Sequence, residues 1–185
     1  MKKRISILLG IILSIMMVGC SNLNNKEASQ HVMISKGETN NTFGMGVDYQ
    51  ISNLMQGKYN VALYAKEYKH GELEKEHTLF EYEVEVNEEG TLPIGVYEEE
   101  EEEELFSGIN GTYQSNSLEF FKDSYDTGMA MSILDEETEL KFNGEMPIVS
   151  YSIGDKITNS INLSEDLQLG TNKKDLIIYL KVNKI

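Results

Sequence analysis

Cysteine, tryptophan and arginine are nearly missing from this chain of 185 residues, which has one Cys, no Trp and a single Arg at position 4. One cysteine excludes an internal disulfide and a cysteine-rich metal site. The absence of tryptophan disfavours a site in which an indole ring stacks on a sugar. Beyond Arg4, the chain has no guanidinium group for bidentate recognition of phosphate or carboxylate.

Basic residues are outnumbered by acidic ones, with 16 Lys and Arg against 31 Asp and Glu and a formal net charge of −15. A protein that binds DNA or RNA needs a cationic surface to neutralise phosphates, so the sequence predicts no nucleic acid partner. Hydrophobic residues make up 40% of the chain, which is enough to build a core. The length allows one ordinary domain or two very small ones.

The short motifs of several enzyme classes are also absent. The sequence has no Gly-x-Ser-x-Gly elbow, no Ser-x-x-Lys pair, no His-Glu-x-x-His zinc motif and no Gly-x-x-x-x-Gly-Lys phosphate loop. We therefore predict no catalytic residue and no cofactor. A hydrolase that uses two carboxylates across a cleft stays open as an alternative, because sequence cannot place such a pair.

The first 20 residues have the order of a secretory signal peptide. Residues 2–4 are basic, residues 5–18 are almost wholly apolar, and a polar stretch begins at Ser21. The apolar run is shorter than the ~20 residues that a helix needs to span a bilayer. An uncleaved anchor or a buried apolar helix is the alternative interpretation.

The apolar run ends in Met17-Val18-Gly19-Cys20, which resembles the lipobox of bacterial lipoproteins. The resemblance implies cleavage after Gly19 and a diacylglyceryl group on the Cys20 thiol. Two acyl chains hold a protein stably on a membrane, whereas one binds only reversibly. The resemblance thus implies a lipid-anchored protein on the extracytoplasmic face of the cell membrane. The Lys-rich, Asn-rich composition is similar to that of Gram-positive lipoproteins.

Loss of the signal peptide would make the chain more acidic. Residues 1–19 contain three basic and no acidic residues, so the mature chain would have 13 basic against 31 acidic residues and a formal charge of −18. Anionic lipids would repel such a domain, mainly within about 10 Å. The charge therefore predicts a domain that faces outward, toward cations or basic partners.

The segment from Cys20 to residue 42 is mostly polar, and we predict that it is a flexible tether. Within it, residues 31–34 could form a short strand that joins the edge of the domain. His31 would then be a solvated residue and not a ligand. The domain itself is predicted to run from residue 43 to residue 185.

Hydrophobic residues alternate with polar ones through most of this domain. Residues 78–86 alternate aromatic or aliphatic side chains with glutamates, and residues 59–66 show a similar pattern. His70-Gly71 lies between the two runs, and we predict a β-hairpin with a long loop there. Asn143-Gly144 between two further runs predicts a second hairpin, because both residues tolerate positive φ. Pro147 soon after it predicts an edge position or a strand start.

Short runs of this kind recur every ten or so residues, and no segment has the period of a long amphipathic helix. We therefore predict an all-β fold: an antiparallel β-sandwich, or a barrel-like sandwich, of about 8–10 short strands.

Seven consecutive glutamates, Glu98 to Glu104, form the longest charge run in the domain. Repulsion between neighbouring carboxylates disfavours both helix and strand, so a solvated, mobile loop between two strands is predicted. A low-affinity Ca²⁺ site is the alternative, because hard cations prefer carboxylate oxygen.

Two other sets of residues are candidate metal ligands. Asp123 and Asp126 lie in an acidic loop with Gly128, where we expect them to be turn residues that bond their own backbone. His70 and His77 flank the predicted loop 71–76 and would be close to each other if the hairpin folded so. Solvated histidines are the alternative to a metal site there.

The chain has ten tyrosines, and five of them fall near predicted strand ends or outer faces: Tyr64, Tyr68, Tyr97, Tyr113 and Tyr125. They could line a binding surface, or pack in the core with the hydroxyl at its rim. Together with the lipobox, these features lead us to expect a membrane-anchored, non-catalytic binding or accessory module with a protein or glycan partner. An envelope hydrolase and an inhibitor or immunity-type protective lipoprotein are the alternatives.

Overall fold

The computed structural model describes residues 31–38, 45–88, 90–99, 104–124, 127–155, 157, 161–163 and 167–185. Every element below belongs to one compact unit, His31–Ile185.

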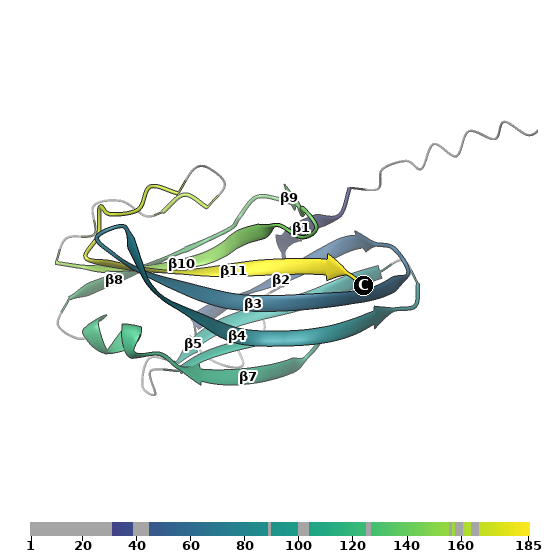
Figure 1. Ribbon diagram of the computed structural model, residues 1–185, viewed down its shortest axis with the longest axis horizontal. Coiled ribbons are helices and arrows are strands. Elements are labelled where there is room, and N and C mark those ends of the chain that lie inside the picture. The colour runs from purple at the N-terminus through teal and green to yellow at the C-terminus, as the bar shows by residue number, and fades with distance from the viewer. Residues whose placement is uncertain are drawn as a thin grey trace, which may run out of the picture. The chain divides into compact units, whose positions relative to one another are not determined.

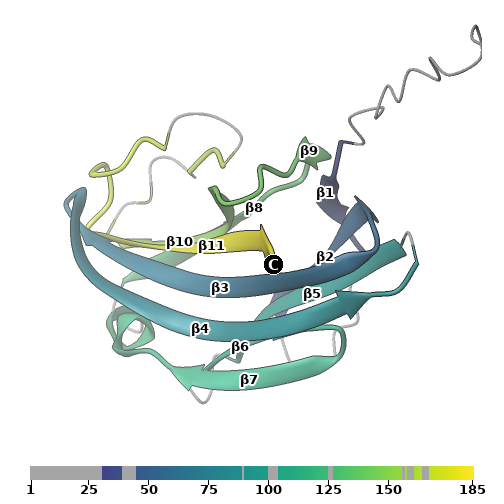
Figure 2. The ribbon, with the colours of Figure 1, turned by 45° about the vertical axis from the view of Figure 1, so that its right-hand side comes forward.

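Two antiparallel sheets face each other across the core (Figures 1 and 2). The six-stranded sheet has the order β7-β6-β5-β2-β1-β9 and the five-stranded sheet the order β4-β3-β11-β10-β8. Their bounds are β1 Met33–Lys36, β2 Met45–Leu54, β3 Gly57–Lys69, β4 Glu72–Val86, β5 Gly90–Glu99, β6 Glu104–Ile109, β7 Thr112–Ser117, β8 Gly128–Ile133, β9 Thr138–Glu139, β10 Glu145–Gly154 and β11 Lys174–Lys184. The all-β sandwich is confirmed, with eleven strands and one 3-10 helix, η1 (Glu119–Ser124), in the described residues.

Alternation places one face of each strand in the core. In β3, Val61, Leu63 and Ala65 are fully buried and lie opposite buried residues of β11. The residues between them point to the outer face of the five-stranded sheet. Burying an aliphatic side chain contributes roughly 1.5–3 kcal/mol, so a one-residue slip of this register would be strongly opposed.

The connection between β3 and β4 differs from the predicted long loop. It is a two-residue turn, in which His70 has φ 50° and Gly71 has φ 85°. Lys69 pairs directly with Glu72, so residues 72–76 belong to strand β4. The long-loop prediction is wrong because β4 is an edge strand whose first residues are mostly exposed on both faces. Such a strand needs no apolar alternation.

The Asn143-Gly144 signal marks a turn but no hairpin. Asn143 has φ 60°, and its backbone N–H donates to the Val182 carbonyl of β11 at 3.0 Å. The flanking strands β9 and β10 lie in different sheets, so the turn carries the chain from one layer to the other. Tertiary pairing therefore overrides the local signal.

Pro147 does occupy the predicted kind of position. It lies in β10 at a β-bulge, and the pairing of β10 with β8 begins only at Val149. Because Pro147 has no partner in β8, its lack of a backbone N–H does not remove a hydrogen bond between β10 and β8.

The ordered sheet begins before residue 43. Strand β1 lies within the stretch assigned to the tether, and it pairs with β2 on one side and β9 on the other. The short strand expected near residues 31–34 is thus present, shifted by two residues.

The glutamate run is not a loop along its whole length. Glu98 and Glu99 end strand β5, Glu104 begins β6, and Glu99 lies opposite Glu104. Glu98 is 3% exposed, and its negative charge adds to burial in raising the pKa of Tyr151. The loop prediction is wrong at both ends, because the β5–β6 ladder extends into the run. Residues 100–103 lie outside the described residues.

Candidate functional site

Several of the predicted site residues fall outside the part of the chain that the structure describes. These are Gly19, Cys20, Asp126 and Tyr125. Asp123 falls in the last turn of η1, so part of the expected acidic loop is helical. The other metal candidates can be placed.

The two domain histidines are not brought together. His70 occupies the tight turn, whereas His77 pairs with Ala65 on the neighbouring strand. Ala65 precedes His70 by five residues, so the two histidines are separated by about 17 Å along the strand direction. His77 Nε2 lies 2.6 Å from Glu67 Oε1, and Glu67 is buried. The described residues contain no group of three or more His, Cys, Asp or Glu that could hold a metal.

Glu98 and Glu104 also point to different surroundings. Glu98 is buried at the end of β5, and Glu104 accepts a hydrogen bond from the Ser115 hydroxyl of β7. We therefore find no shared cation geometry between these two described residues.

The tyrosines form two separate clusters, one on the outer face of each sheet. Tyr97 and Tyr113 lie on the six-stranded sheet, with ring centroids 6.0 Å apart and the planes at 63°. Tyr64 and Tyr179 stack on the five-stranded sheet at 5.8 Å and 16°. Tyr68 adjoins the second pair, with its hydroxyl 3.4 Å from that of Tyr179.

The first pair, which we call the tyrosine floor, lies directly on glycines. Strand register places Gly46 opposite Tyr97, Gly95 opposite Gly108, and Gly108 opposite Tyr113. A Cβ at Gly95 would lie 2.8 Å from Tyr97 Cε2 and 2.9 Å from Tyr113 Cε1, and one at Gly46 or Gly108 would overlap backbone oxygen and a ring. Glycine inside a strand often marks such a close approach.

Asp48 of β2 joins the tyrosine floor. Its Oδ1 would lie 2.9 Å from a Cβ at Gly95, and a hydrogen bond links its carboxylate to the Tyr97 hydroxyl. Burial raises the pKa of Tyr97 and Tyr113, and the nearby Asp48 charge raises both further. Both phenols therefore stay protonated at neutral pH. Tyr97 itself is 1% exposed, so the groups of the floor that a ligand could contact are the Asp48 carboxylate and the partly exposed Tyr113.

A groove of about 670 Å³ runs past this floor. Tyr113, Asp48 and Gln50 line it from the sheet, and Lys36 and Glu38 line it from the chain around the end of β1. Lys36 Nζ is 3.3 Å from Asp135 Oδ1, which ties the rim to the segment after β8. The volume falls in the ~300–1,000 Å³ range of ligand sites.

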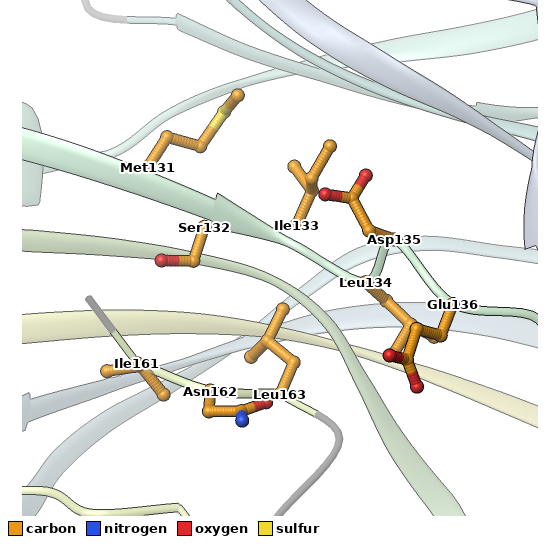
Figure 3. A pocket seen from close by; sticks show the side chains of 9 residues that line it. All are labelled: Met131, Ser132, Ile133, Leu134, Asp135, Glu136, Ile161, Asn162 and Leu163. Atoms are coloured by element: carbon orange, nitrogen blue, oxygen red, sulfur yellow. The ribbon is translucent and has the colours of Figure 1, made fainter.

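A second hollow of about 480 Å³ lies at the free edge of β8. Figure 3 shows Met131 and Ile133 projecting to one side of this strand and Ser132 to the other, toward Ile161. Asp135 also lines it, so the Lys36–Asp135 pair lies between the two hollows. The β8 hollow brings together fewer side-chain hydrogen-bonding groups than the groove.

The second tyrosine cluster is covered by a lysine that forms an ion pair with a neighbouring glutamate. Lys66 Nζ lies 5.5 Å and 4.9 Å from the ring centroids of Tyr64 and Tyr179, and 2.7 Å from Glu145 Oε2. The hydrogen bond from Lys66 lowers the pKa of Glu145. Burial alone would lower the pKa of Lys66, but the hydrogen bond to Glu145 and the charges of Glu145 and Glu76 together raise it. We call this group the lysine-capped cluster.

Among the residues that the structure describes, no helix is long and apolar enough to cross a membrane. Comparison with protein-family models, with curated proteins and with solved structures gave no match. The assignment of the groove as the candidate site therefore rests on its geometry and chemistry.

Sequence reasoning named Tyr97 and Tyr113 but missed Asp48 and the glycines. A signal was present: Gly46, Gly95 and Gly108 each interrupt a strand-like run. Glycines on three neighbouring strands that lie beside or opposite a tyrosine on one face indicate a ring lying on the sheet. That register cannot be obtained without knowing which strands pair.

Proposed function

We propose that this protein is a lipid-anchored, extracytoplasmic binding module without catalytic activity, and that the groove beside the tyrosine floor binds a glycan of the cell envelope. The observation that carries the proposal is the aromatic floor on Gly46, Gly95 and Gly108 beside Asp48. The lipobox-like residues Gly19 and Cys20 support the location.

The chemistry of the groove favours a hydroxyl-rich ligand. Tyr113 is a partly exposed aromatic side chain, while Asp48, Gln50 and Lys36 offer an acceptor, an amide and a cation around it. Sugars combine apolar C–H faces with many hydroxyl groups, so such a ring and polar rim match them. A rigid floor also lowers the entropic cost of binding.

Sedimentation of the purified full chain with insoluble envelope glycan tests this function. We expect Tyr113→Ala and Asp48→Asn to weaken binding by about tenfold or more, because each removes a contact at the centre of the site. Tyr82→Ala is the matched control, since Tyr82 is 46% exposed on strand β4. Equal binding by all three variants would rule out the groove. New reducing ends released from the glycan would instead favour the hydrolase.

The anchor has a separate test. We expect Cys20→Ser to release the protein into the medium or to leave an unprocessed precursor, because the thiol that would carry the diacylglyceryl group is gone. Membrane fractionation and the mass of the product measure this. Unchanged retention together with unchanged mass would contradict the lipid anchor.

A protective or inhibitory lipoprotein is the second candidate, and strand β4 favours it. Glu81, Glu83 and Glu85 are exposed at alternate positions of this edge strand. Such a row would attract a basic protein, with an association rate that falls as salt rises. Replacing all three with Gln should abolish that attraction and leave glycan sedimentation unchanged.

A further inference from the structure

A buried group of side-chain oxygen atoms lies away from the groove, where the segment that joins β10 to β11 meets these two strands. In Figure 2 the described residues of this segment lie on the opposite side of β10 and β11 from β5, β6 and β7. The end of the segment is held by backbone hydrogen bonds: the Lys173 N–H donates to Ile153 O at 3.1 Å, and the His70 N–H donates to Lys173 O at 3.3 Å. A Cβ on Gly71 would lie 3.2 Å from Gly170 Cα, so the β3–β4 turn packs on the segment.

Three polar side chains meet beneath it. Asp175 of β11 is 1% exposed, Ser152 of β10 is 2% exposed, and Asn172 is 4% exposed. The Ser152 hydroxyl donates to Asp175 Oδ1 at 2.7 Å, and Asn172 Nδ2 donates to the same oxygen at 2.9 Å. Asp175 lies opposite both Ser152 and Tyr68, on the outer face of the five-stranded sheet.

The hydrogen bonding of this cluster is unbalanced. Both donors reach Asp175 Oδ1, whereas Asp175 Oδ2 and Asn172 Oδ1 have no hydrogen-bond partner among the described residues. The ion pairs formed by described residues do not include Asp175. A buried carboxylate without a compensating charge costs several kcal/mol, and natural proteins pair such groups or coordinate metals with them.

The two unpartnered atoms are both oxygens, and one belongs to a carboxylate. Rotating the Asn172 amide would not help, because it would place Oδ1 against Asp175 Oδ1. A water molecule could donate to both oxygens, but it would leave the carboxylate charge uncompensated. A hard cation satisfies the oxygens and the charge together.

We propose that Asp175 Oδ2 and Asn172 Oδ1 are ligands of a Ca²⁺ ion, with the Ser152 hydroxyl oxygen as a neighbouring third donor. This site is distinct from the glutamate run and from the histidines. It contains one carboxylate and neutral oxygens, so it differs from sites built from several acidic residues or histidines. A low ligand charge gives weak affinity, of the order of 10⁻⁴–10⁻³ M. The bound ion would fasten the β10–β11 segment to the five-stranded sheet.

Thermal unfolding of the purified full chain, stripped with a chelator, tests the site at constant ionic strength. We expect Ca²⁺ to raise Tm by about 4 °C at ten times its Kd, and to raise it further with the logarithm of the Ca²⁺ concentration above that. Mg²⁺ should give less, because it demands octahedral geometry and dehydrates reluctantly. Asp175→Asn should abolish the Ca²⁺ response. A response to Na⁺ alone, or to no ion, would overturn the proposal.

Asn172→Asp is a second test of the site, which can be made even if Asp175→Asn does not fold. A second carboxylate should tighten Ca²⁺ binding roughly tenfold or more. Without a cation it should lower Tm, because two carboxylates would then be buried together. Asn87→Asp, at an exposed position, adds the same charge and should leave the Ca²⁺ response unchanged. If Asn172→Asp lowers Tm equally with and without Ca²⁺, no cation binds there.

Discussion

The tyrosine floor and the lysine-capped cluster both consist of tyrosines on the outer face of a sheet. They differ in the charged side chain that lies next to the rings. In the lysine-capped cluster, Lys66 lies over both rings and binds Glu145, so the aromatic faces and the charge are satisfied within the protein. A cation over an aromatic ring contributes about 0.5–2 kcal/mol. This cluster therefore stabilises the sheet.

The tyrosine floor has an acidic neighbour instead, because the Asp48 carboxylate accepts a hydrogen bond from the Tyr97 hydroxyl. Its rings rest on glycine backbone, and the groove beside it has about three times the volume of the hollow next to the lysine-capped cluster, 670 Å³ against 220 Å³. Strand glycine costs roughly 0.5–1 kcal/mol relative to alanine. Tyr97 is 1% exposed and its ring plane lies at 63° to that of Tyr113, so Tyr113 and Asp48 form the accessible part of the floor.

Gly46→Ala should have the largest effect on this comparison. Its Cβ would overlap Val96 O, a backbone atom that cannot move aside, and the Tyr97 ring. We expect a loss of about 3 kcal/mol or more in the free energy of unfolding, measured with urea. Gly90→Ala is the control, since its Cβ would meet nothing closer than 3.6 Å. Equal stability of the two variants would mean that the rings do not rest on the glycines.

Truncating one tyrosine from each cluster should separate stability from binding. Tyr179 is 7% exposed and packs under Lys66, so Tyr179→Ala should cost about 3 kcal/mol of stability and leave glycan sedimentation unchanged. Tyr113 is more exposed, so Tyr113→Ala should cost only about 1–2 kcal/mol while weakening sedimentation. Urea unfolding and sedimentation of both variants measure this. The reverse pattern would exchange the functions that we assign to the clusters.

The fold was largely predictable because alternation is a local signal. The runs at residues 59–66 and 78–86 became the neighbouring strands β3 and β4, as their period indicated. The errors arose where pairing partners decide the outcome. Asn143-Gly144 turns the chain as expected, but the strand before it pairs with β1 rather than with β10.

The candidate sites were harder to predict for the same reason. Asp48 lies opposite Gly95, Asp175 lies opposite Ser152, and the sequence separations are 47 and 23 residues. No local pattern links such residues, because register across sheets sets which side chains meet. Glu98 shows the converse: its neighbours suggest solvent, yet its place at the end of β5 buries it.

The ion pair of the lysine-capped cluster predicts the smallest effect, a dependence of stability on pH. The pKa of Glu145 is lowered in the folded state, so its contribution is present above pH 4.5 and is lost as pH falls through the folded pKa. Glu145 is 42% exposed, so solvent screening limits the effect to about 0.5 kcal/mol. Glu145→Gln should therefore flatten the acid side of the urea-unfolding profile, with the exposed Glu85→Gln as control. An acid profile identical to that of the unsubstituted protein would show that Lys66 gains nothing from Glu145, and that the rings alone hold it over the sheet.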